Sequence, residues 1–183
     1  MQQLSILNED DILVLSGSIP KSLTNMIYAD IMQCLPKGVL VVVDATGHLL
    51  MNTLNYNPFL IKPNNHELGE MFGVKLKSEE EIIFYAKKLQ EQGASNVLIS
   101  MAGDGAILVT KEGAVHKIGV PKGTVVNSVG AGDSMVAGFM AGYLTKGDYA
   151  YALKLGTASG SATAFSEGLA VKEDIDKLLA TLQ

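Results

Sequence analysis

The sequence contains no arginine, and all 14 of its basic residues are lysines. Only a guanidinium group offers a planar fork of donors that pairs with two oxygens of a carboxylate or phosphate, so bidentate arginine clamps are excluded. A phosphate group bound by this chain must therefore be held by lysine, backbone amides, hydroxyl groups or a metal ion.

Cysteine and long apolar segments are also scarce. The single cysteine, Cys34, cannot form an internal disulfide bond, which fits a reducing compartment. The longest apolar run, Val39–Val43, has 5 residues, whereas a membrane-spanning helix needs about 20. The residues after Met1 show no signal-peptide pattern. We therefore expect a soluble, cytoplasmic protein that does not bind a membrane.

Charge and composition narrow the class of protein further. Acidic residues outnumber basic ones by 19 to 14, and the net charge is −5. Nucleic-acid binding needs a basic face that displaces counterions, so nucleic acid is not an expected partner. A hydrophobic content of 48% with 18% charged residues is typical of a folded chain. A length of 183 residues suits one domain with a core and is short for two.

Short β-rich runs alternate with amphipathic segments along the first half of the chain. A hairpin, with a turn between two strands, follows, and then three helical segments. This order predicts a layered α/β sheet without an internal domain boundary. The predicted strands are 12–15, 39–43, 59–61 and 97–99, the hairpin is 106–110 with 115–120, and the helices are 22–35, 47–54, 64–73, 78–92, 131–145, 149–165 and 172–182.

Each of the four predicted parallel strands is followed by a polar residue. In open α/β sheets, ligands bind beyond the carboxyl ends of the strands, so these side chains are expected to share one edge. Because every strand must run into a polar loop, simple solvation is the alternative explanation. The four residues are Ser16, Asp44, Lys62 and Ser100.

Two further motifs stand at predicted helix starts. Asn64 with Glu67 resembles a capping box, and the alternative is that both organise Mg²⁺ through waters and phosphate oxygens. In Asn127–Asp133, the glycines Gly130 and Gly132 let the backbone approach a ligand closely, and first-turn amides bind anions. Asp133 fits either complementation of the helix dipole or a catalytic role. Small residues on 137–142 predict close packing against 156–164.

The segment NSVGAGDSMVAGFM, 127–140, resembles the second signature of the ribokinase-like (PfkB) carbohydrate kinases. Upstream, LSGSIP at 15–20, VVDATG at 42–47 and FLIKPNNHELGEMFG at 59–73 resemble the branch of that family formed by 1-phosphofructokinase and tagatose-6-phosphate kinase. This resemblance covers essentially the whole chain. It implies a mostly parallel sheet with an antiparallel hairpin at its edge and helices on both faces.

The resemblance also implies roles for individual residues. Asp133 would contact the substrate and act as the catalytic base, and the amides of Gly130, Ala131 and Gly132 would form an anion hole. Ala102 and Gly103 depart from the family's usual glycine placement in the nucleotide-contacting loop. The remaining implied roles are ATP binding by Lys62, Asn64, Glu67, Ser100 and Gly105, sugar-phosphate binding by Ser16 and Ser18, and Mg²⁺ binding by Asp44 and Glu67.

Members of this family are longer, and the resemblance begins at their second half. It implies that residues 1–183 are the C-terminal, nucleotide-binding and catalytic part of one kinase domain, with the N-terminal strands and the β-lid absent. The missing N-terminal half would then be a partner that sugar-dependent turnover requires. A homodimer of the full-length form is a further open expectation.

The implied activity is ATP-dependent phosphorylation of a ketohexose phosphate in the presence of Mg²⁺. Conversion of fructose 1-phosphate to fructose 1,6-bisphosphate is the leading expectation, and tagatose 6-phosphate is the alternative acceptor. A non-catalytic ATP-binding module, or an inactive fragment, is the alternative from a different functional class.

Overall fold

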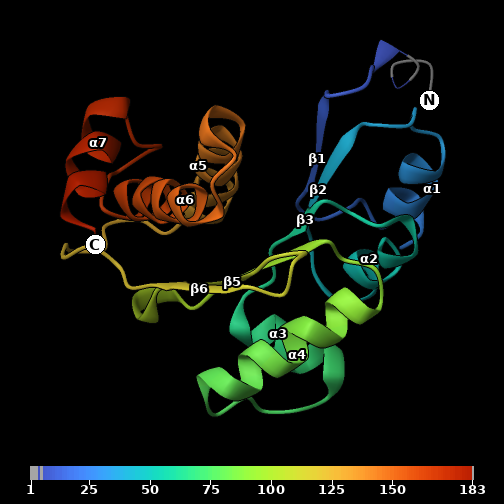
Figure 1. Cartoon of the computed structure of the whole chain (residues 1–183), viewed down its shortest axis with the longest axis horizontal. Helices are drawn as coiled ribbons and strands as arrows, with labels where there is room; N and C mark the ends of the chain where they lie inside the picture. The colour runs from blue at the N-terminus through green and yellow to red at the C-terminus, as the bar shows by residue number, and fades with distance from the viewer. Residues whose placement is uncertain (1–3, 5, 183) are drawn as a thin grey trace. The chain divides into compact units, whose positions relative to one another are not determined.

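The computed structural model describes residues 4 and 6–182 (Figure 1). In this part of the chain, six strands form one sheet in the order β1-β2-β3-β4-β5-β6. The chain divides into two compact units, Met1–Ile99 with Val109–Ala114 and Ser100–Leu108 with Val115–Gln183. No helix among the described residues is long and apolar enough to cross a bilayer.

The first half of the chain alternates strands and helices as predicted. Strands β1 to β4 pair in parallel, with Ile12 opposite Leu40 and Leu60 opposite Asn96. The apolar runs of β2 and β4 are almost entirely buried, as expected for strands covered on both faces. The elements are β1 (Ile12–Ser16), α1 (Ile27–Gln33), β2 (Leu40–Asp44), α2 (Gly47–Met51), the 3₁₀ helix η2 (Leu54–Tyr56), β3 (Leu60–Ile61), α3 (Asn65–Phe72), α4 (Glu79–Glu91) and β4 (Asn96–Ser100).

Helix α1 begins five residues later than the predicted start at Ser22. The N–H of Leu23 donates to the carbonyl of Pro20, and that of Ile27 donates to Thr24, so this segment forms turns. The carbonyl of Asn25, which would accept the next helical bond, is bound by the side-chain amide of Asn52 at 3.1 Å. The prediction of helix for 22–26 was wrong, since these residues form turns that contact Asn52, the residue after α2.

The second half contains the predicted hairpin and three helices. The turn between β5 and β6 is closed by the N–H of Thr110 on the carbonyl of Ala114, at 2.9 Å. Its Gly113 has a φ of +81°, which glycine adopts without strain. The elements are the 3₁₀ helix η3 (Ala102–Asp104), β5 (Ala106–Val109), β6 (Val115–Ile118), α5 (Ala131–Lys146), α6 (Tyr149–Ala164) and α7 (Lys172–Thr181).

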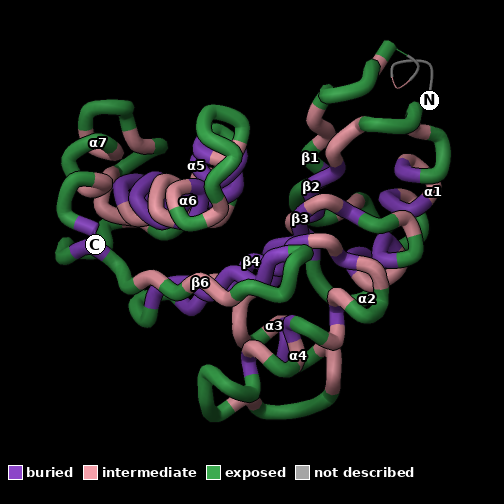
Figure 2. Tube along the Cα trace, in the orientation of Figure 1, coloured by how far each residue is buried: buried purple, intermediate pink, exposed green. Residues whose placement is uncertain are grey.

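Helices α5 and α6 pack along a line of glycines, and most of the facing positions are buried (Figure 2). A Cβ added to Gly138 would lie 2.3 Å from Ser159 Oγ, and one added to Gly142 would lie 2.8 Å from Ala152 Cα. The predicted close packing is therefore confirmed for these glycines. Ala137 and Ala141, which were predicted to share it, are exposed.

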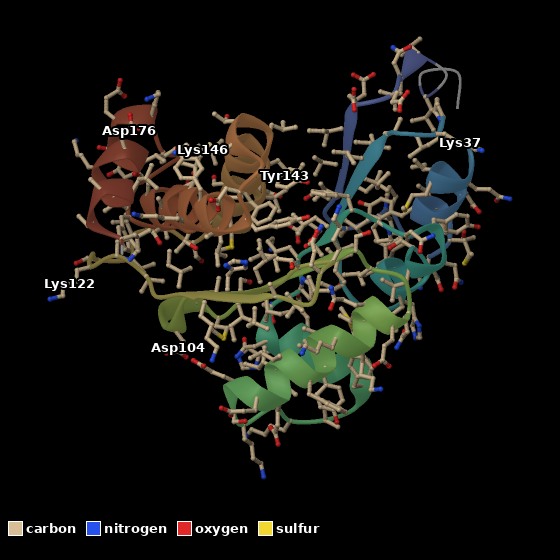
Figure 3. The ribbon with its side chains drawn as sticks, in the orientation of Figure 1. Lys37, Asp104, Lys122, Tyr143, Lys146 and Asp176 are labelled. Carbon is tan, nitrogen blue, oxygen red and sulfur yellow. The ribbon has the colours of Figure 1, made fainter. Side chains whose placement is uncertain are left out.

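Aromatic contacts stabilise the turn that joins α5 to α6. The rings of Tyr143 and Tyr149 stack with their centroids 5.0 Å apart. The Lys146 ammonium lies 3.5 Å from the ring centroid of Tyr151, a favourable cation–π geometry. Figure 3 labels Tyr143 and Lys146 near the end of α5. These contacts hold the helix hairpin at the end opposite the first turn of α5.

Candidate active site

Polar residues meet at the carboxyl ends of β1, β2 and β3. Ser16 and Asp44 are opposite each other in the parallel register. Lys62 follows β3 directly, and its N–H donates to the carbonyl of Val43 at 3.1 Å. The prediction that these strand ends share one edge is confirmed for Ser16, Asp44 and Lys62. Ser100, at the end of β4, belongs to the second unit and is half-buried.

Asp44 and Lys62 form an ion pair at this edge. The distance from Lys62 Nζ to Asp44 Oδ1 is 3.1 Å, and the two side chains are 8% and 18% exposed. A lysine side chain with so little access to water needs a polar or charged partner, and the Asp44 carboxylate provides one. The pair presents a lysine and a carboxylate at the same strand ends, with their orientation fixed by the mutual bond.

The buried Tyr28 of α1 supports the carboxyl end of β1 through its hydroxyl. Its hydroxyl donates to the carbonyl of Ser16 at 2.8 Å and lies 3.3 Å from that of Gly17. Burial, and secondarily the negative charge of Asp44, raise the pKa of Tyr28 above its ordinary value. The hydroxyl therefore stays protonated and keeps donating. No pattern in the sequence identified this residue.

The start of α3 contains the capping box predicted for Asn64 and Glu67. Asn64 Oδ1 accepts from the N–H groups of His66 and Glu67, both at 2.9 Å, and Glu67 Oε2 accepts from the N–H of Asn64 at 2.8 Å. The structural role is therefore confirmed. The same bonds anchor the side chain of Asn64, two residues after Lys62, and that of Glu67, five residues after it. Their roles in binding ATP and Mg²⁺ stay predictions.

In the second unit, the segment before α5 is tied to the end of α6. The N–H groups of Val126 and Asn127 both donate to the carbonyl of Ala164, at 2.8 and 3.1 Å. The Asn127 side chain donates to the carbonyl of Glu167 at 3.2 Å and accepts from the N–H of Val129 at 3.0 Å. These bonds hold the loop against the end of α6 and against the residues that follow α6.

Glycine is required where this loop enters α5. Gly130 has a φ of +80°, and a Cβ there would lie 2.9 Å from a methyl carbon of Leu169. The helix start has no side-chain cap, since residue 130 is a glycine. The N–H of Ala131 donates to the carbonyl of Ser128 at 3.2 Å.

Asp133 lies in the first turn of α5 and is exposed. The side chain is therefore accessible to solvent, and its catalytic role stays a prediction. An exposed carboxylate next to uncapped amides can accept a proton while the amides bind an anion.

Gly105 has a structural role that the sequence did not reveal. Its φ is +93°, and a Cβ there would lie only 1.9 Å from the carbonyl oxygen of Ile118 on β6. The carbonyl of Gly105 accepts from the N–H of Met101 at 2.8 Å, which closes the turn after β4. Ala102 adopts a left-handed φ of +49° in this turn. The predicted nucleotide contact of Gly105 would therefore involve its backbone.

The available carboxylates suit a hard cation that also binds oxygens of a bound phosphate group. Among residues 4 and 6–182, no three His, Cys, Asp or Glu side chains cluster so as to hold a metal ion. Mg²⁺ commonly uses only one or two carboxylates and completes its shell with waters and phosphate oxygens. The carboxylates of Asp44 and Glu67 fit that mode of binding.

Comparisons with known proteins find carbohydrate kinases. The sequence model described as pfkB family carbohydrate kinase matches residues 1–175. The chain is 52% identical over 180 residues to 1-phosphofructokinase of Bacillus subtilis, covering 98% of this chain and 59% of that protein. It is 36% identical over 173 residues to D-tagatose-1-phosphate kinase of Bacillus licheniformis, covering 93% of this chain and 57% of that protein.

A solved structure with a similar fold is phosphofructokinase-2 of Escherichia coli in complex with substrates and products. The TM-score is 0.90 at 27% identity, covering 98% of this chain and 60% of that one. The chain thus spans somewhat less than two thirds of the length of the relatives that it matches.

Proposed function

The chain belongs to the pfkB family of carbohydrate kinases, and from this membership we propose that it transfers the γ-phosphoryl group of ATP to a hydroxyl group of a ketohexose phosphate. The observation that supports the proposal most directly is the exposed carboxylate of Asp133 in an uncapped first turn that begins at the left-handed Gly130.

In this proposal, Asp133 is the catalytic base. It takes the proton of the acceptor hydroxyl as the new bond forms between that oxygen and the γ-phosphorus, and the bond from the γ-phosphorus to ADP breaks. The amides of Gly130, Ala131 and Gly132 stabilise the charge on the transferring group, for which the Ala131 N–H gives up its long bond to Ser128. Such a step depends mainly on alignment and charge.

Separate roles are proposed for the polar residues of the first unit. Lys62 provides a cation, since this chain contains no arginine, and Asn64 and Glu67 help to position ATP. Asp44 and Glu67 would hold Mg²⁺, which neutralises charge on the phosphate oxygens when it is bound. Ser100 and the backbone of Gly105 would contact the nucleotide.

The favoured acceptor is fructose 1-phosphate, which would give fructose 1,6-bisphosphate. The name of the B. subtilis relative, 52% identical to this chain, supports this acceptor. Tagatose 1-phosphate is a second candidate, because relatives named D-tagatose-1-phosphate kinase are 36% and 32% identical. Ser16 and Ser18, both exposed at the end of β1, would contact the sugar phosphate. Tagatose 6-phosphate has less support from these names.

The experiment compares the 183-residue chain with a chimaera in which it replaces the aligned part of the B. subtilis protein. ADP release is measured with fructose 1-phosphate, tagatose 1-phosphate, fructose 6-phosphate and tagatose 6-phosphate. We expect turnover with a ketohexose 1-phosphate in the chimaera and little in the chain alone. An ATP-binding chimaera without turnover on any of these sugars would favour a non-catalytic module.

Asp133→Asn tests the base within the same chimaera. We expect kcat to fall by about 10²–10⁴-fold, the usual contribution of a general base, with the Kd for ATP nearly unchanged. Asp176→Asn is the matched control, because Asp176 is an exposed aspartate on α7 of the same unit (Figure 3). An equal kcat for both variants would exclude the proposed role of Asp133.

A further inference from the structure

We propose that Thr163 is a positioning residue that fixes the first turn of α5, and with it Asp133, for phosphoryl transfer. The inference rests on the proposed function, because it takes that turn to be the reacting one. Thr163 lies in the last turn of α6 and is 1% exposed. Its side chain therefore acts inside the protein and does not meet the substrate.

The buried hydroxyl of Thr163 joins three segments of the chain. It donates to Ser134 Oγ at 2.8 Å and accepts from the backbone N–H of Ala170 at 3.2 Å. Ser134 directly follows Asp133, and its own N–H donates to the carbonyl of Gly130 at 2.9 Å. One hydroxyl thus links the end of α6, the loop after it and the turn that contains the proposed base and anion hole.

Packing alone does not set the position of this turn. A Cβ on Gly160 would lie 3.0 Å from the Ala131 carbonyl oxygen, and one on Gly156 would lie 2.9 Å from that of Met135. These contacts bring the two helix backbones close together, but van der Waals contact is not directional and a glycine has no side chain to interlock. A hydrogen bond has a preferred direction. The bond from Thr163 to Ser134 therefore defines how the first turn of α5 is rotated about the helix axis and where it lies along that axis.

The neighbouring residue completes the same anchor. The carbonyl of Ala164 accepts from Val126 and Asn127 on the loop that leads to α5. Thr163 and Ala164 therefore hold the α5 turn and its incoming loop from one helix end. Loss of the hydroxyl would leave Ser134 and Ala170 without this partner. A shift of the turn by about 1 Å can lower a rate on the order of 100-fold.

The test compares two variants of Thr163, one without the side-chain hydroxyl and one that keeps it. Thr163→Val removes the hydroxyl at nearly constant volume, and Thr163→Ser retains it. The matched control is Thr157→Val, because Thr157 is also 1% exposed on α6 and its hydroxyl has no hydrogen-bond partner among the described residues. Ser134→Ala removes the acceptor from the other side, so the test stands if Thr163→Val does not fold.

In the active chimaera, we expect Thr163→Val and Ser134→Ala to lower kcat by about tenfold or more, with the KM for ATP within about twofold. Thr163→Ser and Thr157→Val should stay near the parent protein. A merely structural role would lower the thermal midpoint without changing kcat at temperatures where the protein is folded. If Thr163→Val and Thr157→Val have the same kcat, or if Thr163→Ser loses as much as Thr163→Val, the inference is wrong.

Amide hydrogen exchange in the 183-residue chain separates this inference from the proposed function. We expect the amides of Ser134 and Ala170 to exchange at least about tenfold faster in Thr163→Val than in Thr157→Val. If the parent chimaera has no turnover, the proposed function fails, while unchanged exchange at both amides would overturn the positioning role itself.

Discussion

The ion pair between Asp44 and Lys62 predicts an asymmetric response to neutralisation. Asp44→Asn removes the carboxylate next to Lys62, whose side chain is only 8% exposed. In Lys62→Met, the carboxylate that remains is 18% exposed and has better access to water. The first variant should therefore be the less stable one, and the double variant should be more stable than the sum of the single effects predicts.

The distance of 3.1 Å sets the magnitude. At an effective dielectric constant of about 20, two unit charges at this distance attract each other by about 5 kcal/mol, and partial exposure of Asp44 reduces this value. Leaving one partner of a buried pair uncompensated typically costs about 3–5 kcal/mol. We expect a loss of about 3 kcal/mol for Asp44→Asn, about 2 kcal/mol for Lys62→Met, and a coupling energy of about 2 kcal/mol.

Urea denaturation of the four proteins in the cycle measures these free energies of unfolding. The control cycle uses Lys88 and Glu91 on α4, which are 2.7 Å apart but 40% and 62% exposed. Exposed pairs of this kind contribute about 0.5 kcal/mol or less. A coupling between Asp44 and Lys62 that is no larger than the coupling on α4 would refute the reasoning from burial.

Two more predictions concern the backbone and the pH response. Gly105→Ala should destabilise the chain by about 3 kcal/mol or more, because the new Cβ would lie 1.9 Å from the Ile118 carbonyl oxygen at a φ of +93°. Thermal unfolding measures this loss. Gly103→Ala is the control, since a Cβ at Gly103 meets nothing within 4 Å. The raised pKa of Tyr28 means that the folded state binds the proton more tightly than the unfolded state. The contribution of the Tyr28 proton to the free energy of unfolding is complete below the ordinary pKa and declines as the pH rises toward the folded-state pKa. When the pH is raised above about 10, the free energy of unfolding should therefore fall less in Tyr28→Phe than in the parent chain.

Several features could be predicted because their signals are local. Asn64 and Glu67 are three residues apart, and the capping box depends only on that spacing and on the chemistry of the two side chains. Strands β2 and β4 were evident from continuous apolar runs, since both faces of these strands are buried. The edge formed by Ser16, Asp44 and Lys62 followed from the rule that parallel strands end together.

Features that depend on tertiary contacts could not be predicted. The turns before α1 include a hydrogen bond from the side chain of Asn52 to the carbonyl of Asn25, 27 residues away. Tyr28 supports the end of β1 across 12 residues of sequence, and nothing in its neighbourhood distinguishes it from an ordinary core tyrosine. The residue pattern of a helix shows which of its faces is apolar. It does not show which distant polar group will form a hydrogen bond near its first turn.

The same limit explains why the anchor of the candidate site was missed while its loop was found. The sequence identifies Gly130 and Asp133 because glycine and aspartate have distinctive backbone and charge properties. The partners that hold this loop are the backbone carbonyls of Ala164 and Glu167, and a carbonyl is the same whatever side chain it accompanies. Substitutions at 164 and 167 that keep the helix intact should therefore be tolerated, whereas substitutions of Thr163 that remove its hydroxyl, the anchoring group, should not. A substitution scan of residues 163–167, read out by ATP turnover of the chimaera, would contradict this argument if residue 164 were as sensitive to conservative, helix-compatible changes as residue 163.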